Sequence, residues 1–149
     1  SLCKKYNSLF IVNDRIDIAL AVEADGIHLG QEDMPTKIAR KLLGSEKIIG
    51  RSTHCLKDIK KAEEEGCDYI GIGAIFPSET KTKLNPIGID YLKKGLNQTL
   101  LPAFAIGGIN SSNINKLNQI NNLRIAVSDA IINSSDPFSQ TEELFKSLT

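Results

Sequence analysis

Two aspartates follow apolar runs of the sequence, at the points where buried strands would end. Asp14 comes shortly after Leu9–Val12, and Asp33 comes shortly after Gly26–Leu29. Carboxylates at the ends of neighbouring strands can share a Mg²⁺ ion, which prefers a few carboxylates together with substrate phosphate oxygens and retained waters. Asp14 and Asp33 are therefore candidate Mg²⁺ ligands.

Each aspartate also has a purely structural explanation. Asp14 precedes Arg15 and would pair with it or cap the next helix, and Asp33 would cap a helix that begins at Pro35. Either residue taken alone is explained in this way. The pair, combined with groups suited to phosphate further along the chain, favours the metal site.

Two later regions are suited to phosphate. The segment Pro77–Lys83 combines hydroxyl groups and lysines inside the longest loop, Gly73–Pro86, and long loops in compact domains are often functional. A solvated lysine-rich loop would have the same composition. Gly107-Gly108 and Ser128 each precede a helical pattern, where backbone N–H groups favour an anion.

Neither histidine is assigned to catalysis. His28 lies inside an apolar run, which is typical of an interior histidine with satisfied hydrogen bonds. His54 follows the next strand, and no acid–histidine–nucleophile set accompanies it.

Short β-rich runs alternate with helical patterns along the chain. The expected strands are Leu9–Val12, Gly26–Leu29, Lys47–Arg51, Asp68–Ile72, Pro102–Ile106 and Leu123–Val127. The expected helices are Ile16–Glu23, Pro35–Leu43, Leu56–Glu65, Gly88–Leu96, Ser111–Ile120, a short one at Ala130, and Asp136–Leu148. This alternation predicts an α/β fold with right-handed βαβ units and a parallel sheet.

An open doubly wound sheet and part of a (β/α)8 TIM barrel both fit this order. Nearly every expected strand is followed by polar residues that can bind a ligand or take part in catalysis. This favours the barrel, because a barrel builds its site from many loops at one end. Barrels often bind phosphate after strands 7 and 8. If Gly107-Gly108 and Ser128 mark those loops, residues 1–149 cover roughly strands 3 to 8, the C-terminal three quarters of a barrel, and the first two β/α units are missing.

Composition narrows the classes of function. The chain has 149 residues, with Lys+Arg and Asp+Glu balanced at 18 each, so no nucleic-acid or membrane partner is expected. Its three cysteines are an odd number without a CxxC spacing, which indicates reduced thiols and a cytoplasmic location.

Five motifs lie along essentially the whole chain: Asn13-Asp14-Arg15, His28-Leu29-Gly30-Gln31-Glu32-Asp33, Gly50-Arg51-Ser52-Thr53-His54, Gly71 to Lys81, and Ala105-Ile106-Gly107-Gly108-Ile109. In order and spacing they resemble the motifs of thiamine phosphate synthase. The resemblance implies a (β/α)8 barrel that couples a pyrimidine diphosphate to a thiazole phosphate with the help of Mg²⁺ and releases pyrophosphate.

The resemblance also implies roles for individual residues. Asp14 and Asp33 match the metal ligands. Asn13, Ser52 and Lys81 match the residues that hold the pyrimidine diphosphate, with Lys81 and Asn13 taken as the catalytic pair. Ser78, Thr80 and Gly108, with the loop at Ser128, match the thiazole phosphate site. In the family the diphosphate is regarded as leaving first, so little acid–base catalysis is expected.

The sequence departs from the family in three places. No Gln-x-Arg-x-Lys strand end is present, so we expect this chain alone to have little or no synthase activity, and the strand edges of an unclosed barrel favour a homo-oligomer. Asp129 stands where a serine is usual and would repel phosphate. Lys83-Leu84-Asn85 replaces a run of small residues in the long loop.

Two other functions stay open. A thiazole tautomerase-like isomerase would share the fold but typically lacks the matches to Asp14, Asp33 and Thr80-Lys81. A non-catalytic phosphate-binding remnant is the alternative from a different class.

Overall fold

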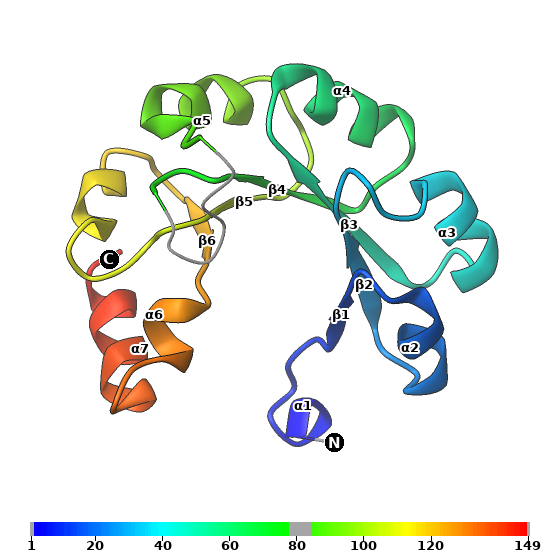
Figure 1. The fold of residues 1–149 in the computed structure, drawn as a ribbon, viewed down its shortest axis with the longest axis horizontal. Helices are drawn as coiled ribbons and strands as arrows, with labels where there is room; N and C mark the ends of the chain where they lie inside the picture. The colour runs from blue at the N-terminus through cyan, green and yellow to red at the C-terminus, as the bar shows by residue number, and fades with distance from the viewer. Residues whose placement is uncertain (1, 78–84, 149) are drawn as a thin grey trace. The chain divides into compact units, whose positions relative to one another are not determined.

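The computed structural model describes residues 2–77 and 85–148, and its elements alternate along the chain as Figure 1 shows. The strands are β1 (Ile11–Asn13), β2 (Gly26–Leu29), β3 (Ile48–Thr53), β4 (Tyr69–Gly73), β5 (Ala103–Ile106) and β6 (Arg124–Ala126). The helices are α1 (Leu2–Lys5), α2 (Ile16–Ala21), α3 (Thr36–Leu43), α4 (Leu56–Glu64), α5 (Gly88–Leu96), the 3₁₀ helix η1 (Ile114–Leu117), α6 (Asp129–Ile132) and α7 (Pro137–Lys146). Within the described ranges, no helix has the length and apolar character needed to cross a bilayer.

The strands form one sheet in the order β1-β2-β3-β4-β5-β6, the same as their order in the sequence. The pairs β1–β2, β2–β3 and β5–β6 are parallel. The chain divides into two compact units, one made of Ser1–Ile70 with Thr99–Pro102 and the other of Gly71–Gln98 with Ala103–Thr149. We refer to these as the first unit and the second unit.

The core of the first unit lies between its strands and its helices. Ile27, Leu29 and Ile49 are fully buried and pack with Ala19 of α2 and Ala39 of α3. The small alanine side chains let the helices approach the sheet closely, and each buried Leu or Ile side chain contributes roughly 1.5–3 kcal/mol. This packing makes the strands rigid supports for the loops at their carboxyl ends.

The second unit has its own buried core. Its buried hydrophobic residues are Ile72, Ile75, Leu92, Ala103, Ala105, Ile109, Ile114, Leu117 and Leu144. At α7, Asp136 caps the helix, because its Oδ1 accepts a hydrogen bond from the Ser139 N–H at 3.1 Å and Pro137 occupies the first turn. This hydrogen bonding lowers the pKa of Asp136.

One expected helix is wrong. The segment Ser111–Ile120 contains only the 3₁₀ helix η1. Bonds such as Lys116 N–H to Asn113 O at 3.0 Å span three residues rather than four. Asparagine side chains compete with helical hydrogen bonding, and here the Asn113 side chain binds the backbone of Asn110 and Gly108.

The other expected elements are present, and their ends either match or differ by one or two residues. The expected strand Leu9–Val12, for example, is Ile11–Asn13, and the expected helix Ile16–Glu23 ends at Ala21. Strand ends depend on which neighbour continues the ladder, and this is a tertiary property.

Candidate functional site

The loop after β1 carries Asn13 and Asp14 at the surface. Asn13 is the last residue of the strand and is in register with His28 of β2. Asp14 has a positive φ of 61°, a conformation that aspartate adopts more readily than most residues, and its N–H donates to His28 O at 2.8 Å. The backbone thus turns out of the sheet at Asp14 while it is still attached to β2.

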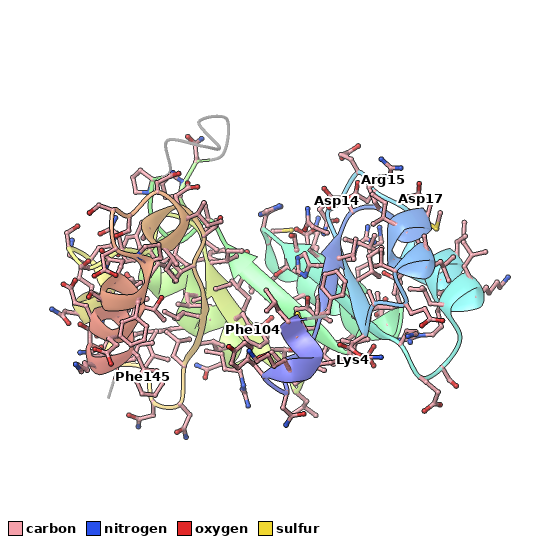
Figure 2. All side chains as sticks on the ribbon, turned by 90° about the horizontal axis from the view of Figure 1, so that it is seen from below. Lys4, Asp14, Arg15, Asp17, Phe104 and Phe145 are labelled. Carbon is pink, nitrogen blue, oxygen red and sulfur yellow. The ribbon has the colours of Figure 1, made fainter. Side chains whose placement is uncertain are left out.

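The ion pair at this strand end is formed by Arg15 and Asp17. Arg15 Nε donates to Asp17 Oδ1 at 2.8 Å, and the guanidinium holds the pKa of Asp17 at about 2. Figure 2 shows Asp14, Arg15 and Asp17 together where β1 leads into α2. Helix α2 has no side-chain cap, so Asp14 is not its cap.

Asp33 closes a turn after β2. Its Oδ2 accepts a hydrogen bond from the Gly30 N–H at 2.6 Å, and the side chain is half-buried. The expectation that Asp33 caps the next helix is wrong, because α3 begins after Pro35 without any side-chain cap. A carboxylate that accepts one hydrogen bond keeps further lone pairs. This turn therefore orients the Asp33 carboxylate and leaves lone pairs that can bind a ligand.

A buried arginine lies behind the loop that carries Asp33. Arg51 of β3 is 3% exposed. Its Nη1 donates to Met34 O at 3.2 Å and to Thr36 Oγ1 at 3.3 Å, and its Nη2 donates to Gln31 O at 3.4 Å. The guanidinium therefore links β3 to two carbonyls of the β2–α3 loop and to the first residue of α3. Arg51 stands in one of the five motifs, but no role was predicted for it, although a charge in an apolar strand was a usable signal.

Ser52 belongs to a hydrogen-bond chain in the first unit. His28 Nε2 lies 2.9 Å from Ser52 Oγ, and His28 Nδ1 lies 2.9 Å from Tyr69 Oη. The Gln31 side chain donates to Ser52 O. The prediction that His28 has satisfied hydrogen bonds is confirmed at both ring nitrogens, and the residue is half-buried rather than fully interior.

Tyr69 reaches His28 because residue 50 is glycine. A Cβ at Gly50 would lie 2.0 Å from Tyr69 Cζ, so any side chain there would displace the ring. Burial raises the pKa of Tyr69 to about 12, so the phenol is neutral at physiological pH. No role was predicted from the sequence for either Gly50 or Tyr69.

In the second unit, the candidate site residues after β5 are the two glycines Gly107 and Gly108. Gly107 and Gly108 have φ values of 98° and 67°, and a Cβ at Gly108 would lie 2.3 Å from Pro77 O. Both positions therefore require glycine. In the part of the chain that the structure describes, the N–H groups of Gly108 and Ile109 donate no hydrogen bond.

Ser128 and Asp129 lie at the start of α6. Ser128 is the N-cap residue, and its carbonyl accepts from Ile131 N at 2.9 Å, but its side chain makes no cap bond. Both residues are exposed. The remaining predicted site residues, Ser78, Thr80 and Lys81, lie outside the described residues, as do Lys83 and Leu84.

The first unit brings Asn13, Asp14, Asp33 and Ser52 to the carboxyl ends of the adjacent strands β1, β2 and β3. The hard oxygen donors of Asp14 and Asp33 suit Mg²⁺, which one or two protein carboxylates often hold together with substrate phosphates. Over residues 2–77 and 85–148, no group of three or more His, Cys, Asp or Glu side chains has the arrangement of a metal site.

A parallel α/β sheet with polar groups at the carboxyl ends of its strands defines a class of proteins that bind their ligands at that edge. Comparison with known proteins identifies the family within this class. The sequence profile of the family described as thiamine monophosphate synthase matches residues 1–131. The chain belongs to this family.

Individual relatives agree with this assignment. The chain is 55% identical over 148 residues to the thiamine-phosphate synthase of Prochlorococcus marinus (strain MIT 9313), covering 99% of this chain and 42% of the relative. It is 43% identical to that of Synechocystis sp. (strain ATCC 27184 / PCC 6803 / Kazusa), covering 99% of this chain and 43% of the relative. The chain thus spans about two fifths of the length of these relatives.

Solved structures show the same fold. Thiamine phosphate pyrophosphorylase from Pyrococcus furiosus superimposes with a TM-score of 0.89 at 39% identity, covering 99% of this chain and 70% of that chain. The 3-hexulose-6-phosphate synthase from Salmonella typhimurium superimposes with a TM-score of 0.70 at 18% identity, covering 99% and 75%, which indicates a shared fold only.

Proposed function

We propose that the complete natural protein containing this chain is a thiamine phosphate synthase. It would be a transferase that couples 4-amino-2-methyl-5-(diphosphooxymethyl)pyrimidine to a thiazole ethyl phosphate and releases pyrophosphate. The observation that carries the proposal is family membership over residues 1–131. The acidic, amide and hydroxyl side chains at the ends of β1, β2 and β3 support it.

We assign the diphosphate end of the reaction to the first unit and to Lys81. Asp14 and Asp33 would hold Mg²⁺, which supplies positive charge against the leaving diphosphate. Asn13 and Ser52 would donate hydrogen bonds to the diphosphate oxygens, and Lys81 would add a second positive charge. Ser52 is already oriented by His28, which supports a fixed binding role.

We assign the thiazole phosphate to Gly108, Ser128, Ser78 and Thr80. The open N–H groups and tight glycine geometry after β5 support this part of the proposal. An exposed carboxylate at Asp129 opposes a phosphate nearby, so Asp129 would point away from it.

The resemblance to the family implies the chemistry. The C–O bond to the diphosphate breaks first, its electron pair leaves with pyrophosphate, and the thiazole nitrogen then forms the new C–N bond to the pyrimidine methylene carbon. The residues stabilise the departing charge and hold the two substrates together, which is where most of the acceleration would arise. Neither step requires a histidine base.

The proposal also covers the barrel topology, the cellular location and the oligomeric state. Strands β1 to β6 would correspond to strands 3 to 8 of a (β/α)8 barrel, and two further β/α units would complete it. The unpaired cysteines Cys3, Cys55 and Cys67 support a cytoplasmic location. A homo-oligomer is compatible with the strand edges at β1 and β6.

Replacement of the proposed ligands tests the function. In the complete natural protein, Asp14→Asn and Asp33→Asn should each lower kcat/KM by about 100-fold or more, since even changes beyond the ligands cost about 10- to 100-fold in metal affinity. Both should also weaken the Mg²⁺-dependent binding of pyrophosphate measured by calorimetry. The matched control Asp17→Asn, on the neighbouring ion pair, should leave both nearly unchanged.

Other outcomes would contradict the proposal. If the wild-type protein bound pyrophosphate equally well with and without Mg²⁺ and formed no thiamine phosphate, the synthase assignment would be wrong. Isomerisation of a thiazole phosphate in the same assay would point to the tautomerase-like function.

A further inference from the structure

Two asparagine side chains converge on one carbonyl of the glycine loop in the second unit. Asn113 Nδ2 donates to Gly108 O at 2.7 Å, and Asn110 Nδ2 donates to the same oxygen at 3.3 Å. Both asparagines are half-buried, and both lie after the loop in the sequence. No other backbone oxygen in the described part of the chain receives two side-chain amide donors.

Each asparagine is itself held in place by its second amide atom. Asn113 Oδ1 accepts from the Asn110 N–H at 3.0 Å. Asn110 Oδ1 accepts from the Ser112 N–H at 2.9 Å and from Ser112 Oγ at 2.6 Å. The donors that reach Gly108 therefore have a set direction. These bonds also explain why residues 111–120 do not form the expected α-helix.

The consequence is a fixed orientation for two N–H groups. In a trans peptide the C=O of Gly108 and the N–H of Ile109 point in opposite directions, so holding the carbonyl on one side presents the N–H on the other. The N–H of Gly108 is set as well, because its φ of 67° and the anchored carbonyl fix both adjoining peptide planes. Neither N–H donates a hydrogen bond among residues 2–77 and 85–148. Ile109 is 4% exposed, so its buried side chain anchors the far end of the loop.

We propose that Asn113, assisted by Asn110, is a positioning residue that aims the Gly108 and Ile109 N–H groups at the monophosphate of the thiazole substrate. This inference rests on the proposed function, and it adds a residue that touches no substrate atom. Asn113 acts on the phosphate through the backbone. Its loss should therefore weaken the recognition of the phosphate group and of nothing else on either substrate.

The test compares a phosphorylated ligand with its unphosphorylated form. In the complete natural protein, Asn113→Asp keeps the Oδ1 acceptor for Asn110 but replaces the NH₂ donor with an oxygen that repels Gly108 O. Affinity for the thiazole ethyl phosphate should fall about tenfold, the size expected for losing a hydrogen bond and leaving its partner unpaired. Affinity for the unphosphorylated thiazole alcohol should stay within about twofold of wild type, since about 0.4 kcal/mol separates such values.

Steady-state kinetics and a second variant distinguish a specific effect on the thiazole phosphate from a general loss of structure. The KM for the thiazole phosphate should rise by the same factor as its affinity falls, with kcat and the KM for the pyrimidine diphosphate nearly unchanged. Asn110→Ala removes the longer 3.3 Å bond to Gly108 O together with the two bonds that Asn110 Oδ1 accepts from Ser112. It keeps the shorter bond from Asn113 to Gly108 O, so it should give the same pattern with a smaller change. It also replaces the first variant if Asn113→Asp fails to fold. The control Asn115→Ala changes an exposed asparagine of η1 and should alter neither affinity.

Each remaining outcome contradicts a different statement. If the wild-type protein prefers the phosphorylated thiazole and both variants keep that preference, the positioning role is wrong and the proposed function stands. If the variants lose affinity equally for both ligands, Asn113 has only a structural role. If the wild-type protein shows no preference for the phosphorylated thiazole, the proposed function is wrong and this inference fails with it.

Discussion

Tyr69 links the interior of the first unit to a residue with a proposed binding role. Its hydroxyl lies 2.9 Å from His28 Nδ1, and the other imidazole nitrogen lies 2.9 Å from Ser52 Oγ. The tautomer that donates to one partner accepts from the other, so the two hydroxyl groups and the ring constrain one another. Ser52 is thereby held in one rotamer before any ligand binds.

The pKa of Tyr69 leads to a prediction about stability at alkaline pH. Burial raises the pKa to about 12 in the folded state, against an ordinary value of 10.0. The folded protein therefore keeps the proton that the unfolded chain loses, and stability should fall as the pH rises from about 10 to about 12. Urea unfolding over this range should show a steeper loss for wild type than for Tyr69→Phe. Equal slopes would contradict the shift.

Arg51 is the buried residue whose replacement should be most costly. Replacing it with lysine removes a planar fork that serves Gln31 O, Met34 O and Thr36 Oγ1. We expect a loss of about 2–4 kcal/mol in the free energy of unfolding, because two half-buried carbonyls and the buried Thr36 hydroxyl lose their donors. Chemical denaturation measures this loss. The exposed Lys57→Arg change in α4 is a control and should have almost no effect.

At the scale of elements, strand β3 needs a glycine opposite the first residue of β4. The aromatic ring of Tyr69 occupies the space above Gly50, and it is this space that lets the ring reach β2. The sheet therefore depends on a pair of residues rather than on either one alone.

A double-mutant cycle tests this dependence. Gly50→Ala should cost about 1–3 kcal/mol of stability, the usual range for overpacking, because the added Cβ would lie 2.0 Å from Tyr69 Cζ. In a Tyr69→Ala background the same change should cost little, since the ring is gone. Additive costs would show that the two residues do not compete for this space.

At the scale of the whole molecule, β1 and β6 are the end strands of the sheet that the structure describes. End strands carry unpaired N–H and C=O groups, which favour association with other strands. The curated relatives are also longer than this chain, which covers 42% of the first of them.

These facts predict the behaviour of residues 1–149 expressed alone. We expect little or no formation of thiamine phosphate by this chain, and self-association that increases with concentration in size-exclusion chromatography. The complete natural protein, assayed at the same concentration, should be active. Robust turnover by residues 1–149 alone would contradict the prediction.

The sequence by itself was sufficient for the order of elements and for the family. Apolar runs with period and length typical of buried strands marked all six strands to within a few residues, because burial on both faces leaves a strong local signal. The aspartates, Ser52 and the glycine pair were recognisable because each comes within a few residues of the end of such a run. The short 3₁₀ helix was missed, because side-chain hydrogen bonds from two asparagines outweighed a weak helical pattern.

Only the tertiary structure decided which side chains meet. Asp33 binds Gly30 rather than capping α3, and Arg15 pairs with Asp17. The contacts of Arg51, Tyr69 and Gly50 are made with residues of other strands and helices. Asn113 donates its hydrogen bond to a carbonyl five residues earlier. The reason is physical: a strand pattern shows which face is buried, whereas a hydrogen bond depends on register and rotamer, which packing sets.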